Sequence, residues 1–503
     1  MPNTTSKPPP YLTLHHIPFQ KYLIEYLFIY PYIIFTNINL TFILTPNIHI
    51  IIKGKNMKKL LSLITLITLI LFNTSANAAL NITISGATQA PIPIAFPPIN
   101  TDNNGVGAFL GFTYANKIHD VVNKDLSNSG LFRILSEKSY IQRFSSLNDK
   151  PNFGDWQVLN SQVLIQAEIQ ENEEILKLSF KIWDIVSQKE LLFELYTADK
   201  NNWRRLAHSM ADAIYERLTG DKGYFNTVIA YISESGPATR RTKRLAIMDQ
   251  DGDGHYFLTS GSNLVLTPRF SPDMKYIAYL SYINNKPRVY MYDLETQKPE
   301  ILGNFPGMTF APRFSPDGKH ILLSYAQNGI TDIYEMDLAT RESKKLTSGP
   351  HIDTSPSYSP DGSKIVFNSD RGGNQQLYIM NRDGSSVERI SFRQGSRYAT
   401  PVWSPRGDYI AFTRMEGGSF YIGVMYPDGT GERTLASGYI VDAPTWSPNG
   451  RVIMFQRQNK GSSTTNAPIQ LYSVDITGQN ERLVLTPGDA SDAAWSPLLE
   501  ETK

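Results

Sequence analysis

The strongest constraint on the fold is a short phrase that occurs six times in the C-terminal half of the chain. Its copies read PRFSPDM, PRFSPDG, PSYSPDG, PVWSPRG, PTWSPNG and AAWSPLL. The repeated serines are Ser271, Ser315, Ser359, Ser404, Ser447 and Ser496, with successive spacings of 44, 44, 45, 43 and 49 residues. A period of this size indicates an array of similar units that are stacked or arranged around an axis.

Each unit contains the same order of short strand-like runs. After the second phrase, for example, such runs cover residues 320–325, 333–337 and 344–347. Four short strands in a period of about 40 to 45 residues are typical of a β-propeller blade. A solenoid of the same period would need helical faces with a 3.6-residue rhythm, whereas these runs alternate with period two. The six phrases therefore predict a six-bladed, all-β propeller.

The two ends of the array are out of phase with the other units. Only residues 498–503 follow the last Ser-Pro pair, which is too short for three more strands, and the missing strands are expected upstream at 227–233, 244–249 and 255–259. We therefore expect one blade to be assembled from both ends of the array. Such a blade closes the ring by strand pairing and leaves no open sheet edge.

Residues 57–78 have the pattern of a secretory signal peptide. Lys58 and Lys59 precede an apolar run over 60–72, and Ala76-Asn77-Ala78 forms the cleavage pattern. The run is shorter than the roughly 20 apolar residues that span a bilayer, and a retained anchor is the alternative. We expect residues 1–56, which precede this signal, to be mis-assigned upstream sequence; the competing interpretation is a membrane-associated leader through 22–35.

Composition excludes several other classes of protein. The chain has no cysteine, so it has no disulfides, no thiol-ligated metal and no lipid-modified cysteine. Lys and Arg number 48 against 47 Asp and Glu, and no basic stripe for nucleic acid is present.

A different pattern fills the segment between the signal peptide and the propeller. Strands are expected at 92–96, 131–135, 163–169, 175–186 and 191–197, and helices at 111–126 and from Asn201 or Asn202 to Gly220. Residues 79–222 are therefore predicted to form a small α/β N-terminal domain, and residues 223–503 the propeller.

This combination resembles the TolB family of the Tol-Pal system. The resemblance rests on the signal peptide, the α/β domain that ends in ERLTGDKGYF at residues 216–225, and the six phrases. It covers the chain from Met57 onward. It implies a soluble, monomeric, periplasmic scaffold without catalysis, cofactor or metal. Such a scaffold is expected to bind the outer-membrane lipoprotein Pal, the inner-membrane protein TolA and other outer-membrane proteins, and so to maintain outer-membrane integrity and aid constriction during division.

The loops before each phrase are the candidate binding surface. They lead into the innermost strands at a mouth of the propeller channel, and they combine aromatic, hydroxyl and acidic residues that suit a peptide or loop of a partner. The resemblance implies that Pal binds here, and the plain alternative is that these are turn residues only. The candidate residues are Met308, Thr309, Ala311, His351, Asp353, Thr354, Tyr398, Thr400, Tyr439 and Asp442. For TolA the resemblance implies the mature N-terminus: Ala79, Leu80, Asn81, Ile82 and Thr83.

Two further chemistries are alternatives to protein binding. Residues 249–254 imitate the start of an EF-hand loop, but the twelfth position is Ser260 instead of a bidentate Glu. The alternative function is a propeller hydrolase or a metal-dependent lactonase. A prolyl-oligopeptidase relative would need a G-x-S-x-G nucleophile elbow, which the chain lacks. A lactonase would need a ring of Glu, Asn and Asp ligands, and the candidate surface offers Asp but no Glu.

Overall fold

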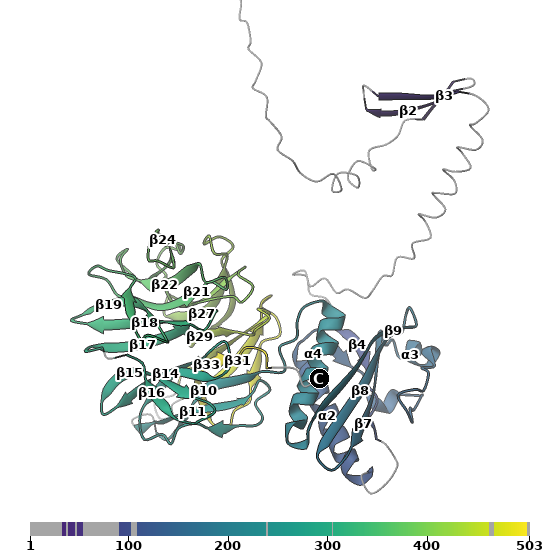
Figure 1. Ribbon diagram of the computed structural model, residues 1–503, viewed down its shortest axis with the longest axis horizontal. Helices are drawn as coiled ribbons and strands as arrows, with labels where there is room; N and C mark the ends of the chain where they lie inside the picture. Colours follow the sequence, from purple (N-terminus) through teal and green to yellow (C-terminus); the bar gives the residue numbers. More distant parts are fainter. Residues whose placement is uncertain are drawn as a thin grey trace, which may run out of the picture. The chain divides into compact units, whose positions relative to one another are not determined.

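The computed structural model describes residues 33–36, 39–45, 48–53, 90–101, 108–237, 240–303, 305–461 and 467–499 (Figure 1). The chain divides into two compact units, residues 1–78 and 79–503. In the first unit, β1 (Ile33–Thr36), β2 (Asn39–Thr45) and β3 (Ile48–Lys53) form an antiparallel sheet in that order. The expected signal peptide and residues 79–83 lie outside the described residues.

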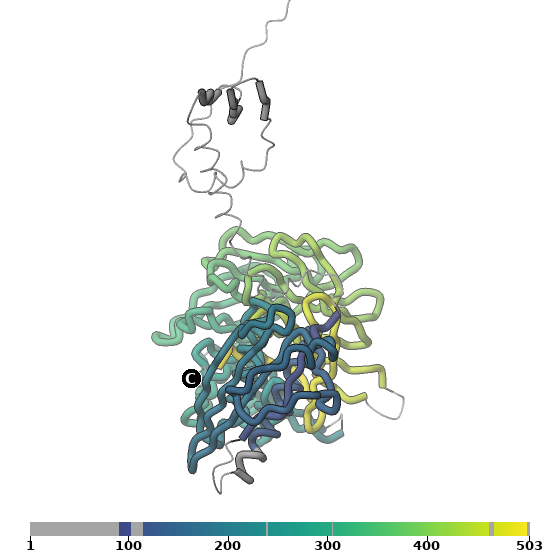
Figure 2. Tube along the Cα trace, turned by 90° about the vertical axis from the view of Figure 1, so that its right-hand side faces the viewer, coloured from purple at the N-terminus to yellow at the C-terminus, as the bar shows by residue number. Residues whose placement is uncertain are grey.

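Six four-stranded antiparallel sheets form the propeller predicted from the six phrases. Their order around the ring follows the sequence, from teal to yellow in Figure 2. The first blade consists of β13 (Val265–Phe270), β14 (Tyr276–Ile283), β15 (Lys286–Asp293) and β16 (Pro299–Ile301). The second consists of β17 (Met308–Phe314), β18 (His320–Gln327), β19 (Ile330–Asp337) and β20 (Ser343–Lys345). The third consists of β21 (Asp353–Tyr358), β22 (Lys364–Ser369), β23 (Gln376–Asn381) and β24 (Glu388–Arg389). The next two are β25 (Arg397–Trp403), β26 (Ile410–Glu416), β27 (Ser419–Met425), β28 (Arg433–Gly438); and β29 (Ile440–Trp446), β30 (Val452–Gln458), β31 (Ile469–Asp475), β32 (Arg482–Val484).

The sixth blade takes its strands from both ends of the propeller segment. Strands β12 (Tyr256–Phe257), β11 (Thr242–Asp249) and β10 (Val228–Ser235) come from the start, and β33 (Asp489–Trp495) comes from the end. Strand β33 pairs antiparallel with β10. The junction is also fixed by side chains, because the indole Nε1 of Trp495 donates to Thr227 Oγ1 at 2.8 Å and the amide of Val228 donates to Ser496 Oγ at 3.0 Å.

Strands β13, β17, β21, β25, β29 and β33 are the innermost strands, each in contact with the next around the ring. Every one of them has an irregular register at the same height, where a residue adopts positive φ. These residues are Thr267, Ala311, Ser355, Thr400, Ala443 and Asp492, with φ between 46° and 55°. A bulge bends a strand and redirects the side chains that follow it, so the channel wall changes direction at this level.

The phrase itself is held by a local hydrogen-bond network. In the third copy, Ser359 Oγ donates to Asp361 Oδ1 at 2.5 Å and accepts from the amide of Lys364 at 2.9 Å. Gly362 closes the turn with φ of 70°, which only glycine adopts without strain. In the fourth copy an arginine replaces the aspartate, and Ser404 Oγ donates to Asp408 Oδ1 instead, at 2.8 Å. The phrase is thus a turn motif.

The α/β domain is built on a mixed sheet with the order β6-β4-β7-β8-β9, and β5 also pairs with β7. The strands are β4 (Ile92–Ala95), β5 (Asn100–Thr101), β6 (Phe132–Ile134), β7 (Val163–Glu171), β8 (Ile175–Asp184) and β9 (Lys189–Asp199). The helices are α2 (Ala108–Asn128), α3 (Phe153–Val158) and α4 (Trp203–Thr219), with short 3₁₀ turns η2 (Glu137–Ser139) and η3 (Lys200–Asn202). Helices α2 and α4 pack together over a core that includes Ile118, Met210 and Phe180, whereas Trp156 of α3 lies in a separate cluster with Leu164.

Helix α4 ends where the sequence predicts. Gly220 adopts the left-handed conformation, with φ of 77°, and its amide donates to Glu216 O at 2.9 Å. At the other end Asn202 occupies the N-cap position, but its side chain makes no capping hydrogen bond. Among the described residues, no helix is both long and apolar enough to cross a lipid bilayer.

Candidate functional site

The candidate residues of the rim lie at or near the starts of inner strands, at the end of the channel opposite the Ser-Pro phrases. Met308 begins β17, Asp353 begins β21, and Tyr439 precedes β29. The chain direction explains this placement, because each inner strand runs from the variable loop, through the bulge, to the phrase. We call these loops and strand starts the variable rim.

Three rim residues are fully buried and support the blades. Thr309 Oγ1 accepts the amide of Val289 at 3.0 Å. Tyr398 donates its hydroxyl to Glu432 Oε2 at 2.7 Å, and burial together with this carboxylate raises the pKa of Tyr398. Asp353 Oδ2 accepts from Arg371 Nη2 at 2.8 Å. These side chains do not reach the surface, so their part in any binding would be to hold the loops in place.

The remaining rim residues are open to solvent to different degrees. Tyr439 is 49% exposed, and Ile352, which adjoins His351 and Asp353, is 41% exposed. The half-buried members are Met308, Ala311, His351, Thr354, Thr400 and Asp442. Thr354 Oγ1 donates to Ser324 Oγ at 3.2 Å. The accessible part of the rim thus mixes apolar and polar groups.

One hydrogen-bonded group joins two blades at the bulge level. Asp442 Oδ1 accepts from Thr413 Oγ1 at 2.7 Å and from Thr400 Oγ1 at 3.1 Å, and the two hydroxyls are 2.8 Å apart. The structure therefore brings Thr400 and Asp442 together, whereas the other rim candidates do not hydrogen-bond one another.

Sequence reasoning missed the partners that fix these residues. Arg371 binds Asp353, and Glu432 binds both Tyr398 and Arg414. These partners are distant in sequence from the rim residues that they bind, so no local pattern predicts the pairs. The one indication in the sequence is an acidic residue at the start of an inner strand, which suggests that a cationic side chain faces it.

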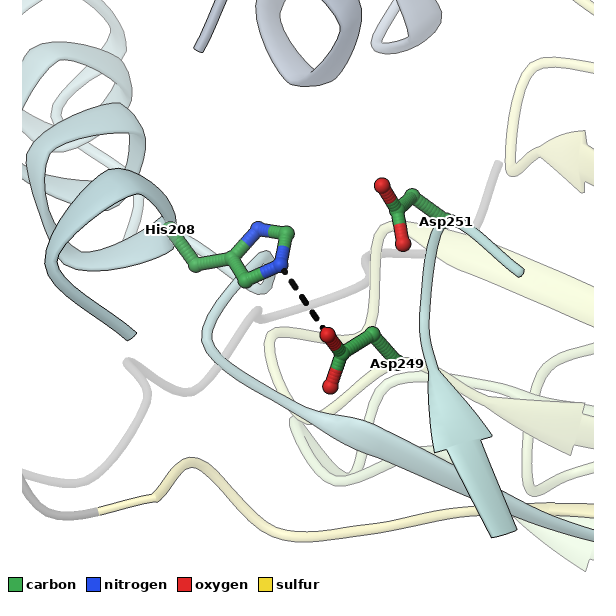
Figure 3. Close-up of side chains that lie close together, drawn as sticks. All are labelled: His208, Asp249 and Asp251. Atoms are coloured by element: carbon green, nitrogen blue, oxygen red, sulfur yellow. Dashed lines mark ion pairs between the residues drawn. The ribbon is translucent and has the colours of Figure 1, made fainter. Parts of the chain in front are cut away.

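A second polar cluster lies where the α/β domain meets the propeller. His208 of α4 faces Asp249, at the end of β11, and Asp251, in the turn that follows (Figure 3). His208 Nε2 and Asp249 Oδ2 form an ion pair at 3.7 Å. The three side chains are buried and close enough to share a metal ion.

Cationic side chains already form hydrogen bonds and ion pairs with the two aspartates of this cluster. Arg204 donates to Asp249 Oδ2 at 2.6 Å and to Asp251 at 2.8 Å, Arg205 also donates to Asp249, and Lys124 lies 3.4 Å from Asp251. A metal ion here would be repelled by two guanidinium groups and would have to displace their hydrogen bonds. The arrangement therefore fits a domain contact better than a metal centre. The EF-hand-like turn contributes its aspartates to that contact.

The charged groups of this cluster change one another's pKa values. Burial by itself lowers the pKa of His208, but Asp125 and Asp249 outweigh it and raise that pKa to about 9. Burial would likewise raise the pKa of Asp249, but His208 and Arg205 lower it well below its usual range. Asp212 accepts the amides of Phe225 at 2.7 Å and Asn226 at 2.9 Å, and burial raises its pKa to about 7.

At the phrase end of the channel lies a cavity of about 410 Å³. All six phrases contribute to its wall, and we call it the phrase-end cavity. Its lining consists of Arg269, Phe270, Pro272, Arg313, Phe314, Ser315, Pro316, Ser357, Tyr358, Ser359, Pro360, Val402, Trp403, Ser404, Pro405, Thr445, Trp446, Pro448, Ala494, Trp495, Ser496 and Pro497. The aromatic residues also pack in the blade cores: Phe270, Tyr358, Trp403, Trp446 and Trp495 are buried.

Comparison with known proteins follows the same division of the chain. The family described as "TolB beta propeller domain" matches residues 215–499, and the one described as "TolB amino-terminal domain" matches residues 80–191. A solved structure of TolB from Acinetobacter baumannii is 31% identical, with a TM-score of 0.71, and covers 81% of this chain and 97% of its own.

Two curated relatives carry the name Tol-Pal system protein TolB. The protein from Pelagibacter ubique is 49% identical over 248 residues, which is 48% of this chain and 56% of the relative. The protein from Paramagnetospirillum magneticum is 49% identical over 239 residues, or 47% of this chain and 52% of the relative. The chain thus spans about half the length of these curated relatives. The propeller match, which covers more than half of the chain, and the solved relative together show that this chain belongs to the TolB family.

Proposed function

We propose that this protein is a periplasmic, non-catalytic binding component of the Tol-Pal system. It joins the outer-membrane lipoprotein Pal to the inner-membrane protein TolA, maintains outer-membrane integrity and aids constriction during division. Family membership supports the assignment to the system, since relatives at 49% identity carry that name.

The variable rim is proposed as the binding surface because it combines exposed apolar side chains with polar ones. Ile352 and Tyr439 expose large apolar side chains, while His351 and Thr354, which lie close to Ile352 in the sequence, offer polar groups. Protein interfaces combine apolar contacts with a polar surround in this way. Buried Asp353 and Tyr398 hold the adjoining backbone through Arg371 and Glu432, so the surface is held in position before a partner arrives. Pal is the proposed partner here.

The proposed TolA contact is the mature N-terminus, Ala79 to Thr83, which lies outside the described residues. It requires that residues 57–78 are removed as a signal peptide and that residues 1–56 are not part of the mature protein. Mass spectrometry of the purified protein tests this step, because a mature chain that begins at Ala79 is expected. A chain that retains residues 57–78 would contradict it.

Replacement of Thr354 tests the rim. Thr354→Arg places a long cation on the half-buried position, so recovery of Pal from outer-membrane extract should fall by at least about tenfold, with the recovered protein identified by mass spectrometry. Thr354→Ser, which keeps the hydroxyl, and Ser343→Arg, on the exposed outer strand β20, are the matched controls and should bind as the wild type does. Unchanged binding by Thr354→Arg would show that the partner uses another surface. Chelator-sensitive ester hydrolysis without a protein partner would overturn the scaffold assignment.

A further inference from the structure

Each inner strand contributes to the wall of the phrase-end cavity the residue that lies two positions after its positive-φ residue. These six are Arg269, Arg313, Ser357, Val402, Thr445 and Ala494. The ring is strongly asymmetric, because two adjacent blades contribute arginines and the other four contribute small or medium side chains. The small residues leave the space of the cavity open in front of the two guanidinium groups.

These two arginines have no acidic partner among the described residues. Arg269 Nη1 donates only to the carbonyl oxygen of Pro268, at 2.6 Å, and its Nε is buried without a partner. The Arg313 guanidinium forms no hydrogen bond or ion pair with any residue that the structure describes. No Asp or Glu is among the residues that line the cavity. Asp492, at the bulge, acts on Arg269 through space but is not bound to it.

The two arginines destabilise the protein when no ligand occupies the cavity. Burial lowers the pKa of Arg269 to about 10. Burial and the neighbouring charge of Arg269 also lower the pKa of Arg313 well below its usual range. Both side chains are half-buried, and two like charges held close together in this way destabilise a fold unless a counter-charge binds them. A planar oxyanion is the group that guanidinium donors match best.

We propose that the phrase-end cavity binds a carboxylate-bearing peptide, with its carboxylate between Arg269 and Arg313. The walls favour a peptide over a small inorganic anion, because tryptophan and proline rings line the space in front of the arginines and can pack against an apolar chain. This site is at the opposite end of the inner strands from the variable rim. It does not depend on the function proposed for that rim.

The cavity carries its own reporter, since Trp403, Trp446 and Trp495 belong to its wall. Purified residues 79–503, which form one compact unit, would be titrated with glutarate at constant ionic strength while tryptophan fluorescence is recorded. Neutral glutaramide and inorganic phosphate are the comparison probes. We expect a saturable change with glutarate, none with glutaramide, and a weaker response to phosphate. A glutarate response equal to that of glutaramide would overturn the site, and preference for phosphate would overturn its assignment to carboxylates.

Arg313→Met separates a binding role from a structural one. Methionine keeps most of the volume and removes a half-buried charge that has no acidic partner among the described residues, so the melting temperature should shift upward while glutarate affinity falls by at least about tenfold. Arg269→Met should behave in the same way, and Arg397→Met, at an exposed position, should change neither quantity. Wild-type glutarate affinity in Arg313→Met would contradict the proposal. So would a lower melting temperature in both cavity variants, because it would make the arginines supports of the fold.

Discussion

His208 Nδ1 and Asp125 Oδ2 lie 2.6 Å apart, with both side chains fully buried between helices α4 and α2. The other oxygen of Asp125 accepts from Gln250 Nε2, in the propeller, at 2.7 Å. A single carboxylate thus connects two helices of the α/β domain with the turn after β11. On its other side, His208 faces Asp249. The contact between the two domains therefore contains a buried charged group beside the apolar residues that both domains contribute to one core, such as Tyr215 and Trp495.

Removal of Asp125 should destabilise the mature protein strongly. Asp125→Ala leaves the His208 ring and the Gln250 amide buried without their acceptor, and loss of one member of a buried pair costs about 3 kcal/mol or more. The free energy of unfolding in urea measures the effect. Asp120→Ala, on an exposed position of the same helix, should change it by less than about 0.5 kcal/mol. An equal, small effect of both substitutions would show that the pair contributes nothing.

The raised pKa of His208 predicts a loss of stability at alkaline pH. Because its folded pKa of about 9 exceeds the ordinary value of 6.5, its contribution is fully present below pH 6.5 and is lost as pH rises to about 9. The shift corresponds to about 3 kcal/mol. Asp212, with a pKa of about 7, and Asp125, whose pKa burial also raises, give losses of the same sign, so a variant of His208 is needed to assign its share of the loss.

His208→Gln tests this assignment. The variant should have a flatter profile of unfolding free energy between pH 7 and 9 than the wild type, since glutamine does not titrate. His351→Gln changes a half-buried histidine of the rim and should keep the wild-type slope. A wild-type slope in His208→Gln would assign the pH dependence to another group.

Closure of the ring depends on β33. A chain that lacks residues 489–503 loses the inner strand of the sixth blade and exposes the edge of β10, which invites edge-to-edge association. We expect this variant to lose its cooperative thermal transition and to aggregate in size-exclusion chromatography. A chain that lacks only residues 500–503 keeps β33 and should behave as the wild type. Cooperative unfolding of the shorter chain as a monomer would contradict this view of closure.

The serines of the phrase should matter for stability only through their buried hydroxyls. Ser359→Ala removes the acceptor of the Lys364 amide and the donor to Asp361, which should cost about 1 to 2 kcal/mol. Ser363, in the same turn, also bonds Asp361 but is exposed. Chemical denaturation of Ser363→Ala should therefore show a change below about 0.5 kcal/mol. Equal losses in the two variants would mean that burial of the hydroxyl is not the cause.

The fold could be predicted because its signals are local and repeated. Each Ser-Pro turn fixes the start of a strand pair within about ten residues, and Gly220 ends α4 through its own backbone conformation. The same reasoning could not find the Asp125–His208 pair, whose members are 83 residues apart. Nor could it show that Asp353 and Tyr398 point inward, because their orientation depends on the bulges and on Arg371 and Glu432.

The two arginines of the phrase-end cavity could be predicted from the sequence only in part. When the phrases are compared position by position, the second residue is Arg269 and Arg313 in two copies and small or medium in the other four. That difference is visible in the sequence. Its meaning is not visible, because only the ring brings the two arginines to the same cavity, whose described lining contains no Asp or Glu.

The variable rim is the surface that we propose binds the outer-membrane lipoprotein of the Tol-Pal system. The most direct measurement is a photo-reactive amino acid placed at Ile352, which is 41% exposed on the rim, followed by irradiation of living cells and mass spectrometry of the adduct. The same amino acid at Ser343 serves as the control. A Pal adduct from position 352 and none from 343 is the predicted result. Equal adducts from both positions, or none from position 352, would contradict the account.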